Sequence, residues 1–249
     1  MPTFPNLKNA PSVEAVLELR VRLSAPYTTA MGASFAQRMQ ASFPKSDEIR
    51  FVSNHVSFGN DVAPESSASV SLIGVRLESE DGKWVVQAKA DGLAVSRMAP
   101  YESWETLIAK LKSTWALYAE VFAPQLVTRI GARFINKLVL GTTTIDLDAV
   151  LFAGPKIPPA LPQHFIQFSS SVVVPRPDVD AAVAITQASE LVPFGPDMGM
   201  NVVLDIDAFS ETPHATNAPE VWRALDVLRE LKNVAFFGSI TPATLARLQ

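Results

Sequence analysis

The chain has 249 residues, of which 48% are hydrophobic and 18% are charged, with 21 Lys and Arg against 25 Asp and Glu. This composition suits one compact unit or two small ones, and the slightly negative charge excludes a polybasic protein that binds nucleic acid non-specifically. The absence of cysteine excludes disulfides, thiolate metal sites and thiol nucleophiles. The amino terminus lacks a signal-peptide pattern and no stretch reaches the ~18 apolar residues of a membrane span, so we expect a cytoplasmic protein without membrane contact.

The first part of the chain, residues 1–124, combines strand and helix patterns. Apolar and polar residues alternate over Val13–Leu23, which predicts a strand with one solvated face, and a four-residue spacing predicts a helix over Thr28–Ser42. Asp-Gly pairs, which are typical of tight turns, separate the last three of four further predicted strands: Arg50–Phe58, Ser69–Glu80, Lys83–Ala90 and Leu93–Met98. A helix with an apolar stripe follows over Tyr101–Phe122 and ends at Pro124.

The second part, residues 125–249, begins with a similar order of elements. We predict a strand, a short helical piece and a proline-rich connector, at Val127–Leu140, Asp146–Phe152 and Gly154–Pro162. Three strands follow, at His164–Val174, Ala181–Leu191 and Asn201–Ala208. A helix is predicted over Asn217–Leu231, with Asn217 as N-cap and Glu220 completing a capping box, and a last helical turn begins at Thr241.

This order of elements predicts an α+β fold. Two successive segments with the pattern β-α-β-β-β(-β)-α suggest a duplicated unit, although the two segments share few residues. We expect an extended or saddle-like antiparallel sheet with the helices over Tyr101–Phe122 and Asn217–Leu231 on one face. The two halves, 1–124 and 125–249, should form one compact unit.

Three segments of the chain carry a family pattern. They are the run Ala10–Val16, with Pro-x-x-Glu-Ala, the helix with Trp104, Trp115 and Tyr118, and the run Arg129–Asn136, with Arg-x-Gly-x-Arg-aromatic-x-Asn. Together they resemble an uncharacterised family of sporadically distributed bacterial proteins of about this length. The family has no established activity, and its sporadic occurrence implies a component of a bacterial defence or toxin–antitoxin-like system.

Three basic residues share one face of the predicted strand Val127–Leu140. They are Arg129, Arg133 and Lys137, and Gly131 leaves open space between the two arginines. Guanidinium groups beside such a space can hold a carboxylate or a phosphate. The alternative, which we favour, is that this basic row pairs with Glu14 and Glu18 if the leading strands of the two halves lie side by side.

Two acidic residues and two tryptophans are further candidates for a site. Asp205 and Asp207 are two residues apart on a predicted strand, so they share a face, and paired carboxylates can bind Mg²⁺. Trp84, beside a predicted turn, and Trp222, in the first turn of a helix, are candidate anchors of a protein interface.

No catalytic residue and no cofactor is predicted. His55, His164 and His214 are isolated in the sequence, and phosphate-loop and nucleophile motifs are absent. We therefore predict a non-enzymatic module that binds a protein or a small ligand, with a protein partner or a second copy of itself. Two alternatives remain open: a metal-dependent phosphodiesterase or nuclease that uses Asp205 and Asp207, with Arg129 and Arg133 holding phosphate, and a pocket for an apolar small molecule.

Overall fold

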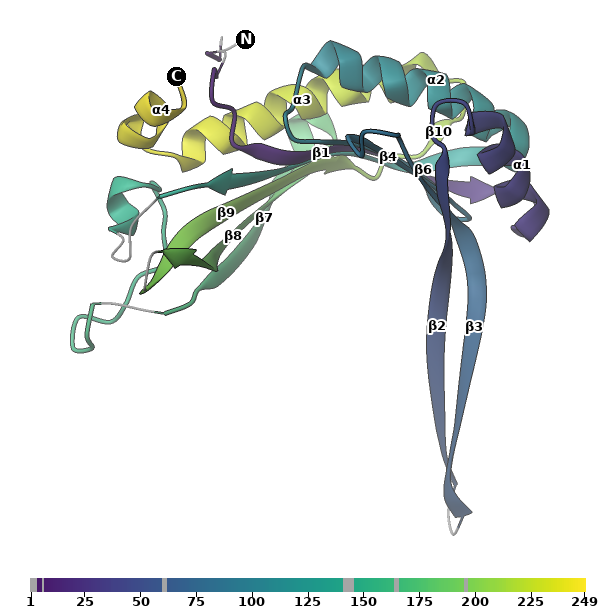
Figure 1. Ribbon diagram of the computed structural model, residues 1–249, viewed down its shortest axis with the longest axis horizontal. Helices are drawn as coiled ribbons and strands as arrows, with labels where there is room; N and C mark the ends of the chain where they lie inside the picture. Colours follow the sequence, from purple (N-terminus) through teal and green to yellow (C-terminus); the bar gives the residue numbers. More distant parts are fainter. Residues whose placement is uncertain (1–3, 6, 60–61, 141–145, 164–165, 195–196) are drawn as a thin grey trace.

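The computed structural model describes residues 4–5, 7–59, 62–140, 146–163, 166–194 and 197–249. Within these residues the chain forms four α-helices and one open, ten-stranded antiparallel sheet, so the predicted α+β class is confirmed. Figure 1 shows the sheet arching beneath the helices, which all lie on its convex side. The predicted saddle-like sheet with helices on one face is therefore confirmed, whereas the duplication stays a prediction.

The elements follow one another largely as the sequence patterns indicate. The leading part contains β1 (Ser12–Leu23), α1 (Thr29–Met39), β2 (Lys45–Gly59), β3 (Val62–Glu78), β4 (Trp84–Lys89), β5 (Gly92–Met98) and α2 (Trp104–Phe122). The remaining part contains β6 (Pro124–Leu138), the 3-10 turn η1 (Leu147–Ala149), β7 (Ser169–Arg176), the 3-10 turn η2 (Pro177–Val179), β8 (Ala181–Phe194), β9 (Asp197–Ser210), β10 (His214–Ala215), α3 (Pro219–Ser239) and α4 (Pro242–Leu248).

The sheet has the strand order β2-β3-β4-β5-β1-β6-β9-β8-β7, and the short β10 pairs with β6. The leading strands of the two parts, β1 and β6, pair with each other at the centre, with Leu17 opposite Ala132. β5 pairs with β1 and β9 pairs with β6, so these two strands flank the central pair. Both edges of the sheet, β2 and β7, are therefore far from the centre.

The core lies between the sheet and the helices. Alternation along β1 buries Ala15, Leu17 and Leu19 on the helix side, while the polar side chains point to the other side, which we call the open face. The α2 stripe packs on β1 and β5, and its Tyr118 and Phe122 are fully buried. α3 covers β6, β8 and β9 in the same way.

The end of α2 and the Asp-Gly turns agree with the prediction because their chemistry is local, whereas α2 begins at Trp104, three residues after the predicted start. Ser103 caps α2 by accepting a hydrogen bond from the backbone N–H of Thr106 at 3.1 Å, and the left-handed Ala123 ends this helix before Pro124. The Asp-Gly pairs turn as expected, with positive φ at Gly82 and Gly92.

The start and the end of α3 were predicted wrongly. The helix begins at Pro219 with Ala218 as N-cap and no side-chain cap, so Asn217 does not form a capping box. Glu220 instead pairs with Arg223 one turn later. The helix also continues past Leu231 to Ser239, because further apolar residues of its stripe are buried against the sheet.

The hairpin of β2 and β3 is longer than its sequence pattern indicates. β4 pairs only with Gly74–Glu78, so most of the hairpin continues as a two-stranded ribbon away from the sheet and from the helices (Figure 1). Phe51, Val52 and Val70 on this ribbon are more than half exposed. The ribbon therefore lies outside the core.

Two of the three histidines lie wholly or partly outside the described residues. His164, predicted to begin a strand, lies outside the described residues, as does the side chain of His55, and β7 starts only at Ser169. His214 lies in β10 and pairs with Val127.

In the part of the chain that the structure describes, no helix has both the length and the apolar character needed to span a bilayer.

Candidate functional site

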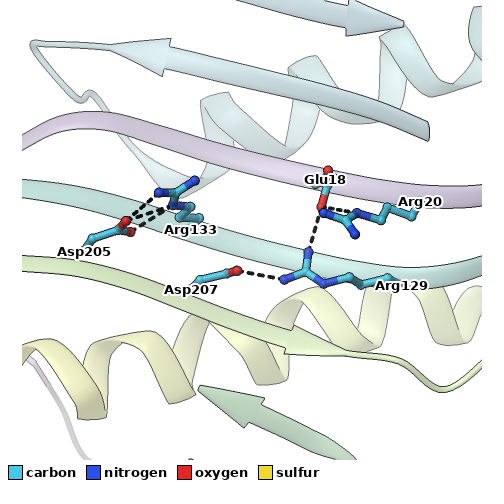
Figure 2. Close-up of polar contacts among 6 residues, drawn as sticks. All are labelled: Glu18, Arg20, Arg129, Arg133, Asp205 and Asp207. Atoms are coloured by element: carbon cyan, nitrogen blue, oxygen red, sulfur yellow. Dashed lines mark hydrogen bonds and ion pairs between the residues drawn. The ribbon is translucent and has the colours of Figure 1, made fainter. Parts of the chain in front are cut away.

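The predicted basic row lies on the open face of β6, near the centre of the sheet. Arg129, Arg133 and Lys137 all project from this side, since the alternate residues of β6, such as Ile130, Ala132 and Phe134, are buried toward the helices. β1 and β9 flank β6 and carry acidic residues on the same face. The charged side chains of three neighbouring strands therefore meet there, as Figure 2 shows for six of them.

Arg129 bridges the strands on both sides of it. Its Nη1 donates to Glu18 Oε2 of β1 and its Nη2 to Asp207 Oδ2 of β9, each at 2.7 Å (Figure 2). Its guanidinium carbon lies 4.6 Å from the centroid of the Phe209 ring. The side chain is only 12% exposed, so this guanidinium is largely shielded from water and has anionic partners on two sides.

The space at Gly131 is occupied by this same guanidinium. A Cβ atom built on Gly131 would lie 2.6 Å from Arg129 Nη1. The glycine therefore makes room for Arg129 to lie across the strand. The open space at Gly131, which favoured an external anion in the sequence, is therefore filled by the Arg129 side chain.

Arg133 pairs with β9 rather than with β1. Its Nε donates to Asp205 Oδ1 at 2.9 Å and its Nη2 to Asp205 Oδ2 at 2.5 Å, a bidentate arrangement that raises the pKa of the guanidinium. Glu18 pairs with the row as expected, but the expected role of Glu14 is replaced by Asp205. The reason is the register, which sets the apolar Val16 opposite Arg133 on β1.

Lys137 completes the row through β8. Its Nζ lies 2.6 Å from Glu190 Oε2, and Asn201 Nδ2 donates to the same oxygen at 3.2 Å. These two contacts hold the pKa of Glu190 below its usual range. Each of the three predicted basic residues therefore has an acidic partner inside the chain.

Asp205 and Asp207 share a face, as predicted, but each of them already binds an arginine. Burial raises the pKa of Asp207, while Arg129 acts in the opposite direction. Across the described residues, no three His, Asp or Glu side chains gather closely enough to hold a metal ion. A divalent cation here would have to displace Arg129 and Arg133, so the arrangement gives the phosphodiesterase alternative no support.

Asn136, the last residue of the Arg129–Asn136 run, is a buried polar residue with its hydrogen bonds satisfied inside the chain. It is 3% exposed, accepts a hydrogen bond from Ser12 Oγ at 2.7 Å, and donates to the carbonyl oxygens of Phe134 and Leu204 at 3.1 Å. The Arg-x-Gly-x-Arg-aromatic-x-Asn run thus joins ion pairs on one face of β6 to a satisfied amide on the other.

The two candidate interface tryptophans are half-buried and covered by cations. Trp84 lies 5.2 Å from the guanidinium carbon of Arg97 and 5.5 Å from Lys110 Nζ, both measured to the ring centroid. Trp222 lies 5.2 Å from Lys112 Nζ. Both rings also pack against the core, and their role as anchors stays a prediction.

A cavity on the helix side of the sheet is lined by none of the candidate site residues that the sequence indicated. It lies between the start of α2, the second half of α3 and the segment that precedes β1, and Lys232 of α3 lines it. Lys232 follows directly after the residue at which the helix was expected to end. The apolar residues Phe236 and Phe237 were the available signal that the helix continues.

Comparison with known proteins does not assign the chain to a family. No family model matches it, and no curated protein shows significant similarity to it.

Proposed function

We propose that this chain is a non-enzymatic module that binds another protein along the β7 edge of its sheet. β7 is the last strand in the sheet order, and in the described part of the chain its pairing partner is β8. Its three consecutive valines, Val172, Val173 and Val174, are 52%, 61% and 42% exposed. This exposed apolar edge is the observation that carries the proposal.

An exposed edge strand offers unpaired backbone groups to another chain. Proteins usually protect such edges with charged side chains, with proline or with a covering loop. β7 has no charged residue before Arg176, which pairs with Asp178 at 2.7 Å, and its one proline, Pro175, stands near the end of the strand after the three valines. An extended segment of a partner can therefore pair with the backbone of β7 and cover its valines.

The open face supports a protein partner over an anionic one. Its central cations are neutralised within the sheet, so it presents little of the positive field that attracts phosphate groups. At the opposite edge, Phe51, Val52 and Val70 add a second exposed apolar region on the β2–β3 ribbon. The resemblance noted in the sequence suggests a partner from a bacterial defence or toxin–antitoxin-like system.

The test places a positive charge on the β7 edge in one variant and the same charge on the neighbouring turn η2 in a control variant. Val173→Lys places an ammonium group on β7, whereas Val179→Lys places the same group on η2, where the side chain is 38% exposed. Tagged wild type and both variants are produced in the native host, and co-purifying proteins are quantified by mass spectrometry. Sedimentation measures self-association in parallel.

Wild type and Val179→Lys should retain the same partner, and Val173→Lys should lose most of it. A partner retained equally by all three proteins would contradict the proposal, and so would a wild-type chain that stays monomeric and alone. Loss of self-association in Val173→Lys alone would identify the partner as a second copy of the chain.

A further inference from the structure

The cavity on the helix side has the size and the lining of a small-molecule site. Its volume is about 450 Å³, within the usual range of ligand pockets. Six aromatic side chains line it together with polar ones such as Glu105, Arg229 and Asn233: Phe4, Tyr101, Trp104, Phe134, Phe236 and Phe237. It lies on the other side of the sheet from the ion pairs and is separate from the β7 edge.

The amino-terminal segment forms one wall of this cavity and is held in place. The Phe4 ring stacks on the Phe237 ring, with centroids 5.0 Å apart and an interplanar angle of 11°. Leu7 packs against the core, and the backbone N–H of Asn9 donates to the carbonyl oxygen of Leu248 at 3.0 Å. The described residues of this segment, Phe4, Leu7 and Asn9, are therefore each held by a contact with the rest of the chain.

Lys232 is the half-buried basic group in this aromatic surrounding. Its Nζ lies 3.8 Å from the centroid of the Phe134 ring. Among the described residues it has no ion-pair partner within 4.0 Å and no hydrogen bond. Arg229, one turn earlier, has a partner, since its Nη2 lies 3.2 Å from Glu105 Oε1.

Burial and the neighbouring charge of Arg229 favour the neutral form of Lys232. Burial is the largest cause that lowers the pKa of Lys232, to about 7, followed by the positive charge of Arg229, while Glu230 acts in the opposite direction. At the start of α2, Glu102 is engaged by Arg97 at 2.5 Å. Desolvation beside a second cation is a recognised way to make a lysine amine nucleophilic.

We infer that the cavity binds a small carbonyl compound with an apolar body and that Lys232 joins it as an imine. The neutral amine attacks the carbonyl carbon and forms a C–N bond. The two amine protons pass to the carbonyl oxygen, which leaves as water when the C=N bond forms. Nothing is oxidised or reduced, so the step needs no co-reactant.

The experiment traps this imine on the full chain. Benzaldehyde serves as the probe at pH 7 with cyanoborohydride, which reduces the imine to a stable benzylamine, and peptide mass spectrometry gives the rate at each lysine. Lys83, whose side chain is 45% exposed, is the reference. We expect Lys232 to react at least about tenfold faster than Lys83, because far more of its amine is neutral.

Two further measurements separate cavity binding from general reactivity. The rate at Lys232 should saturate with benzaldehyde, and Phe237→Ala, which removes the stacked partner of Phe4, should slow it toward the rate at Lys83. Lys232→Arg should abolish the fast modification while the protein stays folded. Equal rates at Lys232 and Lys83, or a rate at Lys232 that never saturates, would overturn the inference and leave the β7 proposal untouched.

Discussion

The guanidinium of Arg129 and the missing side chain of Gly131 depend on each other. The guanidinium is 12% exposed and contacts Glu18, Asp207 and the Phe209 ring. A charge withdrawn from water in this way is tolerated only while its partners stay in place, so loss of the geometry costs more than at an exposed ion pair. At this position, the choice of residue is therefore governed by the neighbouring ion pair.

Gly131→Ala should weaken the fold through Arg129. The new methyl group would meet Arg129 Nη1 at 2.6 Å and push it from its partners, lowering the free energy of unfolding by about 1–2 kcal/mol. Urea denaturation measures this loss. Gly238→Ala is the control, because nothing lies within 4 Å of its added Cβ. A helical alanine there should cost nothing or stabilise by up to about 1 kcal/mol.

Gly131→Ala in an Arg129→Met background tests whether the loss of stability acts through the Arg129 guanidinium. With the guanidinium removed, Gly131→Ala should lose most of its effect, because the atom that it displaces is gone. An equal loss in both backgrounds would show that Gly131 is needed for another reason.

Lys232 should give the fold a distinctive dependence on pH. Its pKa of about 7 in the folded protein lies below the value near ~10.4 expected in the unfolded chain. Between these values the unfolded chain binds more protons, so the contribution of this group to stability rises as the pH rises from about 7 to about 10. Denaturation of wild type and Lys232→Met across this range measures the effect.

Wild type should gain stability relative to Lys232→Met toward the alkaline end. Lys83→Met, at an exposed turn, controls for the loss of a lysine. The expectation is contradicted if the Lys232 and Lys83 variants follow the wild-type curve in the same way.

At the scale of elements, the helix ends show how local and distant contacts combine. Ser103 caps α2 through the backbone N–H of Thr106, a neighbour three residues away. Thr241 caps α4 in the same way, and its hydroxyl also donates to the carbonyl oxygen of Ala149 at 2.6 Å, which ties α4 to η1. The second contact joins residues far apart in the chain.

Removing the Thr241 hydroxyl should therefore cost more than removing an ordinary cap. Thr241→Val keeps the shape of the buried side chain but loses both hydrogen bonds, and should lower the free energy of unfolding by about 2–3 kcal/mol. Ser103→Ala should lose about 1 kcal/mol. Thermal or urea unfolding compares them, and a Thr241→Val loss no greater than that of Ser103→Ala would refute the added role.

At the scale of the whole molecule, the arched sheet has two edge strands, β2 and β7, at opposite ends of the strand order and one core beneath the helices. The helices cover the convex side, and the β2–β3 ribbon and β7 lie at the opposite ends of the strand order (Figure 1). The ribbon pairs with itself beyond the last contact with β4. Its exposed side chains contribute little to the burial that stabilises the fold.

Shortening the ribbon should leave the rest of the protein folded. Joining Arg50 to its opposite residue Leu72 through Asn-Gly removes the free part of the hairpin and keeps the pairs next to β4. The midpoint of thermal unfolding should stay within about 4 °C of wild type, the shift that roughly 1 kcal/mol produces in a chain of this size. A chain that no longer unfolds cooperatively would show that the ribbon belongs to the core.

Most of the elements, and the face that each one buries, follow from local patterns along the chain. Alternation along β1 and the stripe of α2 depend on residues only a few positions apart, so their periods are readable without the fold. The same holds for the Thr241 cap and for the common side of Arg129 and Arg133.

The tertiary structure alone decided which groups meet across strands and where a cavity remains. The β6–β9 register sets Asp205 and Asp207 beside the arginines, and a cavity lined by Lys232 and by aromatic side chains remains between α2, α3 and β6. These outcomes depend on packing between residues that are distant in the chain, and no local period along the sequence records them.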